Sequence, residues 1–193
     1  MPNIDDVLSG TSIESGDSYY DPSLDFDGIV PVGDYYAHIT GLEVKRNIVV
    51  RNKFLADIYV PAFKLSKENS DKDFGSNGTM VSGKAFVGRE IRGKGFFRFK
   101  NPDKAKYPNL SDSQGSNKRY MEFVEALGIK TAEDGGRFRL PEVTEDDIYG
   151  LPVLAKVIHD KWTTDDGEEK STAKVLSLFN WSEGKREMLD VPF

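Results

Sequence analysis

Hydrophobic and polar residues alternate along several stretches of this chain, which is the pattern of β-strands that bury one face. These stretches are residues 34–44, 53–65, 79–100, 153–163 and 170–181. Several glycines interrupt the third stretch, so we interpret it as one long strand or a bent pair of strands. An Asp-Asp-Gly sequence at 165–167 predicts a hairpin turn between the last two.

One segment has helical spacing instead. Its apolar residues recur at i, i+3, i+4 and i+7, and we expect Ser116 to cap its start and Gly128 its end. The order is therefore three strands, a helix and two strands. This order is typical of the oligonucleotide/oligosaccharide-binding (OB) fold. We predict a mainly β protein with an OB-fold-like five-stranded barrel and one α-helix between strands 3 and 4. Other small barrels and sandwiches share this strand count. The helical positions are Tyr120, Phe123, Val124 and Leu127.

Composition divides the chain into three parts: an acidic N-terminal arm (1–28), a barrel domain (29–182) and a C-terminal tail (183–193). The net charge is −6, but the arm holds seven acidic residues and no Lys or Arg. The barrel domain consequently has two more basic than acidic residues. Charge is thus polarised, and the basic middle of the chain is compatible with a polyanionic ligand.

Composition also excludes several classes of chemistry. The chain has no Cys and only two His, His38 and His159, so we expect no disulfide, no metal site and no cofactor. No apolar run approaches the roughly 20 residues that cross a bilayer. The N-terminus lacks the pattern of a signal peptide. We therefore expect a cytoplasmic protein without a membrane partner.

The most basic stretch, residues 84–100, carries six Lys or Arg and one Glu. Strict strand alternation would place cations and one ring on a single face, with Ile91, Phe97 and Phe99 on the other, inside the barrel. Cations attract phosphates, and an exposed ring stacks on any base. The sequence thus predicts a DNA-binding face; the alternative is an ordinary solvated strand face. The predicted face consists of Arg92, Lys94, Phe96, Arg98 and Lys100.

Further contacts are predicted around the first hairpin connection, where OB barrels often grip a strand. A basic surface turn is the competing interpretation there. Two aromatic residues are also candidates for stacking, although core packing is the leading alternative for each. The basic candidates are Lys45, Arg46, Arg51 and Lys53, and the aromatic ones are Tyr59 and Trp162.

Motifs for catalysis are weak. Residues 78–84 match the spacing of a phosphate-binding P-loop as far as its Lys, but Ala85 replaces the Ser or Thr that would hold magnesium. Asp103, Glu168, Glu169 and Lys170 resemble part of a nuclease site, but three of them lie at a hairpin tip and are poorly preorganised. We therefore predict no catalytic residues.

The ordered set of motifs resembles the phage-type single-stranded DNA-binding proteins. It comprises VPVGDYYAHITGLEV, GKAFVGREIRGKGFFRFKN, RYMEFVEALGI, LPVLAKVIHDKW, AKVLSLFNW and the closing LDVPF. The resemblance implies a barrel that coats single strands without sequence preference. It also implies a terminal tip that recruits a polymerase, helicase or other replication or recombination protein. The tip residues are Asp190, Val191, Pro192 and Phe193.

We accordingly expect a non-enzymatic protein that binds single-stranded DNA, and the sequence is compatible with a homodimer. Two alternatives remain: an adaptor barrel that binds only proteins, and a metal-dependent nuclease. The tail departs from the family because Lys185 and Arg186 oppose its acidic residues. The acidic arm is a second candidate for competing with DNA, in which case deleting residues 1–28 should tighten DNA binding at low salt.

Overall fold

The computed structural model describes residues 28–187, apart from residues 77 and 114–116. The acidic arm up to residue 27 and the predicted terminal tip, from Asp190 to Phe193, lie outside the described residues. The predictions made for them therefore stay predictions.

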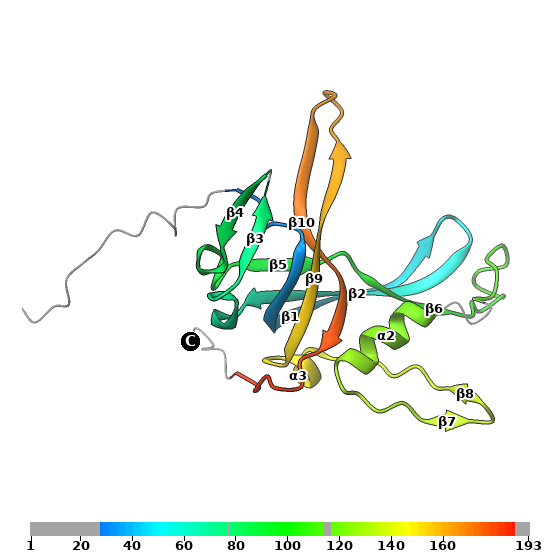
Figure 1. Ribbon diagram of the computed structural model, residues 1–193. Coiled ribbons are helices and arrows are strands. Elements are labelled where there is room, and N and C mark those ends of the chain that lie inside the picture. The colour runs from blue at the N-terminus through cyan, green and yellow to red at the C-terminus, as the bar shows by residue number, and fades with distance from the viewer. Residues whose placement is uncertain (1–27, 77, 114–116, 188–193) are drawn as a thin grey trace, which may run out of the picture.

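The described chain is built around a closed five-stranded barrel whose third strand is split in two (Figure 1). β1 pairs with both β2 and β9, which closes the sheet, and β5 runs parallel to β10. The other barrel pairings are antiparallel. This arrangement confirms the predicted mainly β, OB-fold-like barrel. Its strands are β1 (Gly33–Val50), β2 (Phe54–Leu65), β5 (Glu90–Gly93), β6 (Phe96–Lys100), β9 (Pro152–Thr163) and β10 (Glu169–Asn180).

Helix α2 (Lys118–Ala126) lies between β6 and β9 in the chain, as predicted. It begins after Asn117, while the predicted cap Ser116 lies outside the described residues. Gly128 follows its end with φ +70°, a conformation that glycine adopts without strain. The face predicted from its spacing is buried, and Phe123 stacks on Phe96 of the barrel with ring centroids 4.3 Å apart.

Two segments differ from the sequence prediction. Residues 66–78, which lie between two of the predicted strands, contain a 3₁₀ helix (Lys67–Asn69) and β3 (Asp73–Ser76), which pairs with β4 (Thr79–Ser82). The predicted long strand 79–100 is interrupted by a second 3₁₀ helix, Gly83–Phe86. A Cβ at Gly83 would overlap the carbonyl oxygen of Asn69, so a side chain has no room where these segments meet.

The first hairpin also extends further than predicted. β1 continues to Val50 because a bulge between Lys45 and Ile48, with Asn47 at φ 56°, restores its pairing with β2. The connection shrinks to the turn at residues 51–53. Between α2 and β9, the chain also holds β7 (Glu133–Asp134), β8 (Arg137–Phe138) and α3 (Glu145–Ile148).

The core fills the barrel and continues under α2. Its largest fully buried side chains are aromatic, which suits a small barrel that few residues must fill. The β1–β2, β9–β10 and β7–β8 hairpins project from this body (Figure 1). None of the helices in the described part of the chain has the length and apolar character needed to cross a membrane. The largest buried residues are Tyr35, Tyr59, Tyr120, Phe63, Phe86 and Phe123.

Candidate nucleic-acid interface

Gly95 changes which side chains of the basic stretch face outward. In β5, Ile91 is buried and Arg92 is exposed, as the alternation predicts. Gly95 then adopts φ +108°, which favours glycine, and a Cβ there would lie 3.1 Å from the Ile58 side chain. The next residue, Phe96, is only 3% exposed. The alternation therefore slips by one residue, and every side chain of β6 lies on the opposite face from the one that strict alternation predicts.

The prediction that Phe96 projects outward with the cations is wrong. Phe96 lies directly opposite Tyr59 in the β2–β6 pairing, and directly opposed residues share one face of a sheet. Both residues are buried. Tyr59 is fully enclosed, and its ring packs against that of Tyr120 with the ring centroids 5.1 Å apart. Neither ring is accessible to a base, so the predicted stacking roles of Phe96 and Tyr59 are replaced by core packing.

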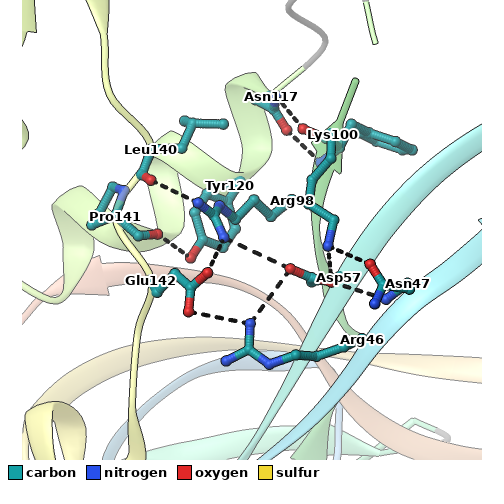
Figure 2. A network of polar contacts seen from close by, with 11 residues as sticks. Arg46, Asn47, Asp57, Arg98, Lys100, Asn117, Tyr120, Leu140, Pro141 and Glu142 are labelled. Carbon is teal, nitrogen blue, oxygen red and sulfur yellow. Dashed lines mark hydrogen bonds and ion pairs between the residues drawn. The ribbon is translucent and has the colours of Figure 1, made fainter. Parts of the chain in front are cut away.

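Arg98 and Lys100 were also predicted to face outward, and they do not. They share the face of Phe96 and converge on the buried carboxylate of Asp57 (Figure 2). The Lys100 Nζ lies 2.7 Å from one Asp57 oxygen, and the Arg98 guanidinium lies 3.7 Å from the other. Arg98 also bonds Glu142 at 3.0 Å. A buried anion thus holds these cations in a structural role.

Arg46 belongs to the same group, 3.6 Å from Asp57 and 3.2 Å from Glu142, although its side chain is 46% exposed. We call these two acidic and three basic residues the Asp57 network. Burial raises the pKa of Asp57, but hydrogen bonds from Lys100 and the Asn47 N–H, with nearby positive charge, outweigh it and lower the pKa overall. A hydrogen bond from Arg98 lowers the pKa of Glu142. The members are Arg46, Asp57, Arg98, Lys100 and Glu142.

The slip at Gly95 brings different rings to the outer face. Phe97 lies opposite Ile58 and Phe99 opposite Ala56, and both rings are half-buried. They stack with centroids 5.9 Å apart, and the half-buried Phe54 meets Phe99 edge-on at 6.0 Å. These rings line an open hollow of about 600 Å³. We call Phe54, Phe97 and Phe99 the ring shelf.

Four cations surround the ring shelf and come from the first hairpin turn and the start of α2. The Lys53 ammonium lies 5.2 Å from the Phe54 ring centroid. Lys118 forms a surface ion pair with Glu122 at 3.8 Å, while Arg119 donates to the Leu176 carbonyl. Among the residues that the structure describes, Arg51 and Lys53 have no carboxylate within ion-pair distance. The shelf cations are Arg51, Lys53, Lys118 and Arg119.

The remaining predicted cations share the outer face but have partners. Arg92 lies opposite Ala62, on the same side of β2 as the partners of Phe97 and Phe99. Arg92 and Lys45 both approach Glu43, at 3.5 and 3.3 Å. Lys94 bonds Asp160 at 2.7 Å. Exposed ion pairs contribute little to stability, so a phosphate can replace these carboxylates at small cost.

The β9–β10 hairpin places a further ring at the surface. Trp162 is 46% exposed on β9, so its predicted accessibility agrees with the structure, whereas core packing does not. Lys170 lies directly opposite it on β10. In an OB barrel the first and last hairpins flank the ligand, and here they supply Arg51, Lys53 and Trp162.

The phosphate-binding motif that the sequence analysis set aside does not have the geometry of a P-loop. Residues 79–86 form a short strand and a 3₁₀ helix rather than a phosphate-binding helix start. The Nε2 atoms of His38 and His159 lie 3.1 and 3.0 Å from backbone carbonyl oxygens. Within the described ranges, no group of three or more His, Asp or Glu side chains is arranged to hold a metal ion.

Sequence reasoning missed the ring shelf because it continued the alternation across Gly95. The glycines were recognised as bends, but a bend alone does not say whether the register slips. Asp57 was a signal that the sequence did contain. It is the one charged residue between Phe54 and Pro61 in β2, and an isolated carboxylate in such an apolar strand needs cationic partners.

No protein-family model matches this sequence, and comparison with curated proteins finds no match.

Proposed function

We propose that this protein binds single-stranded DNA without sequence preference and is not an enzyme. One observation carries the proposal: the outer face of an OB-like barrel presents three neighbouring phenylalanine rings beside Arg51 and Lys53, which have no carboxylate partner among the described residues. Contiguous apolar patches that remain accessible on a folded protein commonly mark binding sites.

The chemistry of the ring shelf favours single strands. An unpaired base offers a π-face to a ring, and each stacked base contributes on the order of 1–3 kcal/mol. Phenylalanine has no polar atom with which to read a base edge, so the binding is tolerant of sequence. Arg51, Lys53, Lys118 and Arg119 then neutralise the phosphates on both sides of the stacked bases.

The biological role follows from the resemblance found in the sequence. A protein of this kind coats exposed strands during replication or recombination and removes hairpins from them. Its terminal residues Asp190 to Phe193 would recruit a polymerase, helicase or exonuclease. The barrel-based part of the proposal does not depend on that recruitment.

The test is a fluorescence titration of the full chain with labelled poly-dT at several salt concentrations. We expect binding whose logarithmic salt slope is about −0.7 per neutralised phosphate of a single strand. An excess of duplex competitor should displace little of the labelled strand. Absence of binding at low salt contradicts the proposal and favours an adaptor barrel, and shortening of the strand in magnesium favours a nuclease.

A further inference from the structure

The β7–β8 hairpin is a defined projection rather than an irregular loop. Its two strands are joined by Gly135 and Gly136, with φ values of 56° and 76°. Two consecutive residues with positive φ form the tight turn that matches the twist of a hairpin. On this hairpin Phe138 is 55% exposed, and Arg137 and Arg139 on either side of it are exposed.

The base of this hairpin is fixed to the strand that carries the ring shelf. Arg98 donates to the Leu140 carbonyl at 3.1 Å, and the Tyr120 hydroxyl donates to the Pro141 carbonyl at 2.8 Å (Figure 2). Because Arg98 stands between Phe97 and Phe99 in β6, the Asp57 network sets the position of the hairpin relative to the ring shelf.

The surface between the hairpin and the ring shelf is continuous. A second open hollow, of about 690 Å³, lies between the hairpin, the start of α2 and the preceding loop, and Phe138 and Arg137 line it. Lys118 lines this hollow and the hollow over the ring shelf. A strand that leaves the ring shelf past Lys118 therefore enters the second hollow.

The charges around this path suit a polyanion. Asp112 lines the second hollow, but it is engaged by Lys104 at 3.2 Å. Arg139 has no ion pair with any carboxylate whose side chain the structure describes. An exposed ring between two guanidinium groups repeats the combination of stacking and charge found at the ring shelf.

We infer that the β7–β8 hairpin is a second contact region for the same polynucleotide, an inference that rests on the proposed function. A single strand would stack bases on the ring shelf, pass Lys118, and meet Phe138 and Arg137, with the exposed Arg139 next to them. The occupant is an unpaired polynucleotide longer than the ring shelf alone can hold. Binding should therefore strengthen with strand length beyond the shelf, and the hairpin supplies that gain.

The experiment compares two strand lengths, because an OB barrel alone occupies only about 4–16 nucleotides. Wild-type protein and the variant F138A/R139A are titrated with a labelled thymidine strand of about 6 nucleotides and one of about 30. The matched control M80A/K84A removes one exposed apolar and one exposed basic residue near the β3–β4 hairpin, away from both hollows. All variants are first checked for unchanged thermal unfolding.

We expect F138A/R139A to bind the long strand at least about fivefold more weakly, as the loss of one stacked base implies, with a smaller salt slope. Its affinity for the short strand should match that of the wild type, and the control should change neither. If wild-type protein binds the long strand and F138A/R139A binds it equally well, the hairpin inference is wrong while the proposed function stands. If wild-type protein binds neither strand, the proposed function itself fails.

Discussion

The two faces of β6 use the same kinds of residue for opposite purposes. On one face, Arg98 and Lys100 close around the buried Asp57, beside the enclosed ring of Phe96. On the other face, Phe97 and Phe99 are only half-buried, near Arg51 and Lys53, which have no carboxylate partner in the described chain. Five consecutive residues thus supply both a structural network and a candidate ligand surface.

This difference shows that a row of cations in a sequence does not identify a ligand surface by itself. A single buried carboxylate is enough to turn such a row inward, because a charge without water needs opposite charge and hydrogen bonds. The rings on the opposite face then become the informative feature. The following predictions separate the two faces, one by stability and the other by binding.

Removing the buried carboxylate should have the largest effect. Asp57→Ala leaves Arg98 and Lys100 without their shared partner, and we expect the free energy of unfolding to fall by about 3–5 kcal/mol. Urea unfolding followed by tryptophan fluorescence measures the change. The control Asp160→Ala breaks the exposed pair with Lys94 and should alter stability by no more than about 1 kcal/mol. Equal effects of the two substitutions would mean that the Asp57 network is not structural.

The aromatic residues should divide in the same way. Phe96→Ala empties a core position and should cost about 3–5 kcal/mol of stability. The double variant F97A/F99A should instead weaken poly-dT binding, by about 1–3 kcal/mol for each base that loses its ring. Titration and urea unfolding of both variants give the two readouts. Phe179→Ala, at a ring 50% exposed on β10 outside the ring shelf, is the binding control. Undiminished binding by F97A/F99A would contradict the assignment of the ring shelf.

The sequence patterns predicted the barrel better than they predicted the candidate site. The strands and α2 were predictable because alternation and helical spacing extend over many residues, and a sheet must bury one face. The site depended on one dihedral angle, at Gly95, and on the partner of Asp57 across the sheet. Neither is local information, since the slip becomes visible only when β6 is paired with β2.

The β7–β8 hairpin could be predicted in part from the sequence. Asp134, Gly135 and Gly136 form a turn signal, but the strands on either side have only two residues each, too few to show alternation. Its position depends on Arg98 and Tyr120, which are distant in the sequence from the segment they anchor.

The cations beside the ring shelf should have a smaller effect than its rings. R51A/K53A removes two side chains that we expect to neutralise phosphates, and the salt slope should become shallower by about 0.7 for each phosphate left without its cation. The matched control K67A/K84A removes two exposed lysines from the two 3₁₀ helices, away from the ring shelf. Poly-dT titrations at several salt concentrations measure both slopes. Identical slopes for the two variants would show that Arg51 and Lys53 do not bind phosphate.

Acidification should destabilise the folded protein by weakening the Asp57 network on the inner face of β6. This effect should be smallest near neutral pH. The pKa of Asp57 and that of Glu142 are lowered in the folded state, so their contribution is present above the ordinary carboxyl pKa of about 4. It is lost as the pH falls through the lowered values, when both groups become protonated. Urea unfolding between neutral and acidic pH measures this loss. Asp57→Asn should show a shallower acid dependence, and an unchanged dependence would contradict the role given to Asp57.

Photocrosslinking tests the central claim most directly, because it asks where the strand lies. Wild-type protein is irradiated with a thymidine strand that carries iodouracil, and the adducts are located by mass spectrometry. We predict adducts at Phe54, Phe97 or Phe99. Adducts confined to residues outside the outer face of β2 and β6, on a protein that binds the strand, would contradict the account.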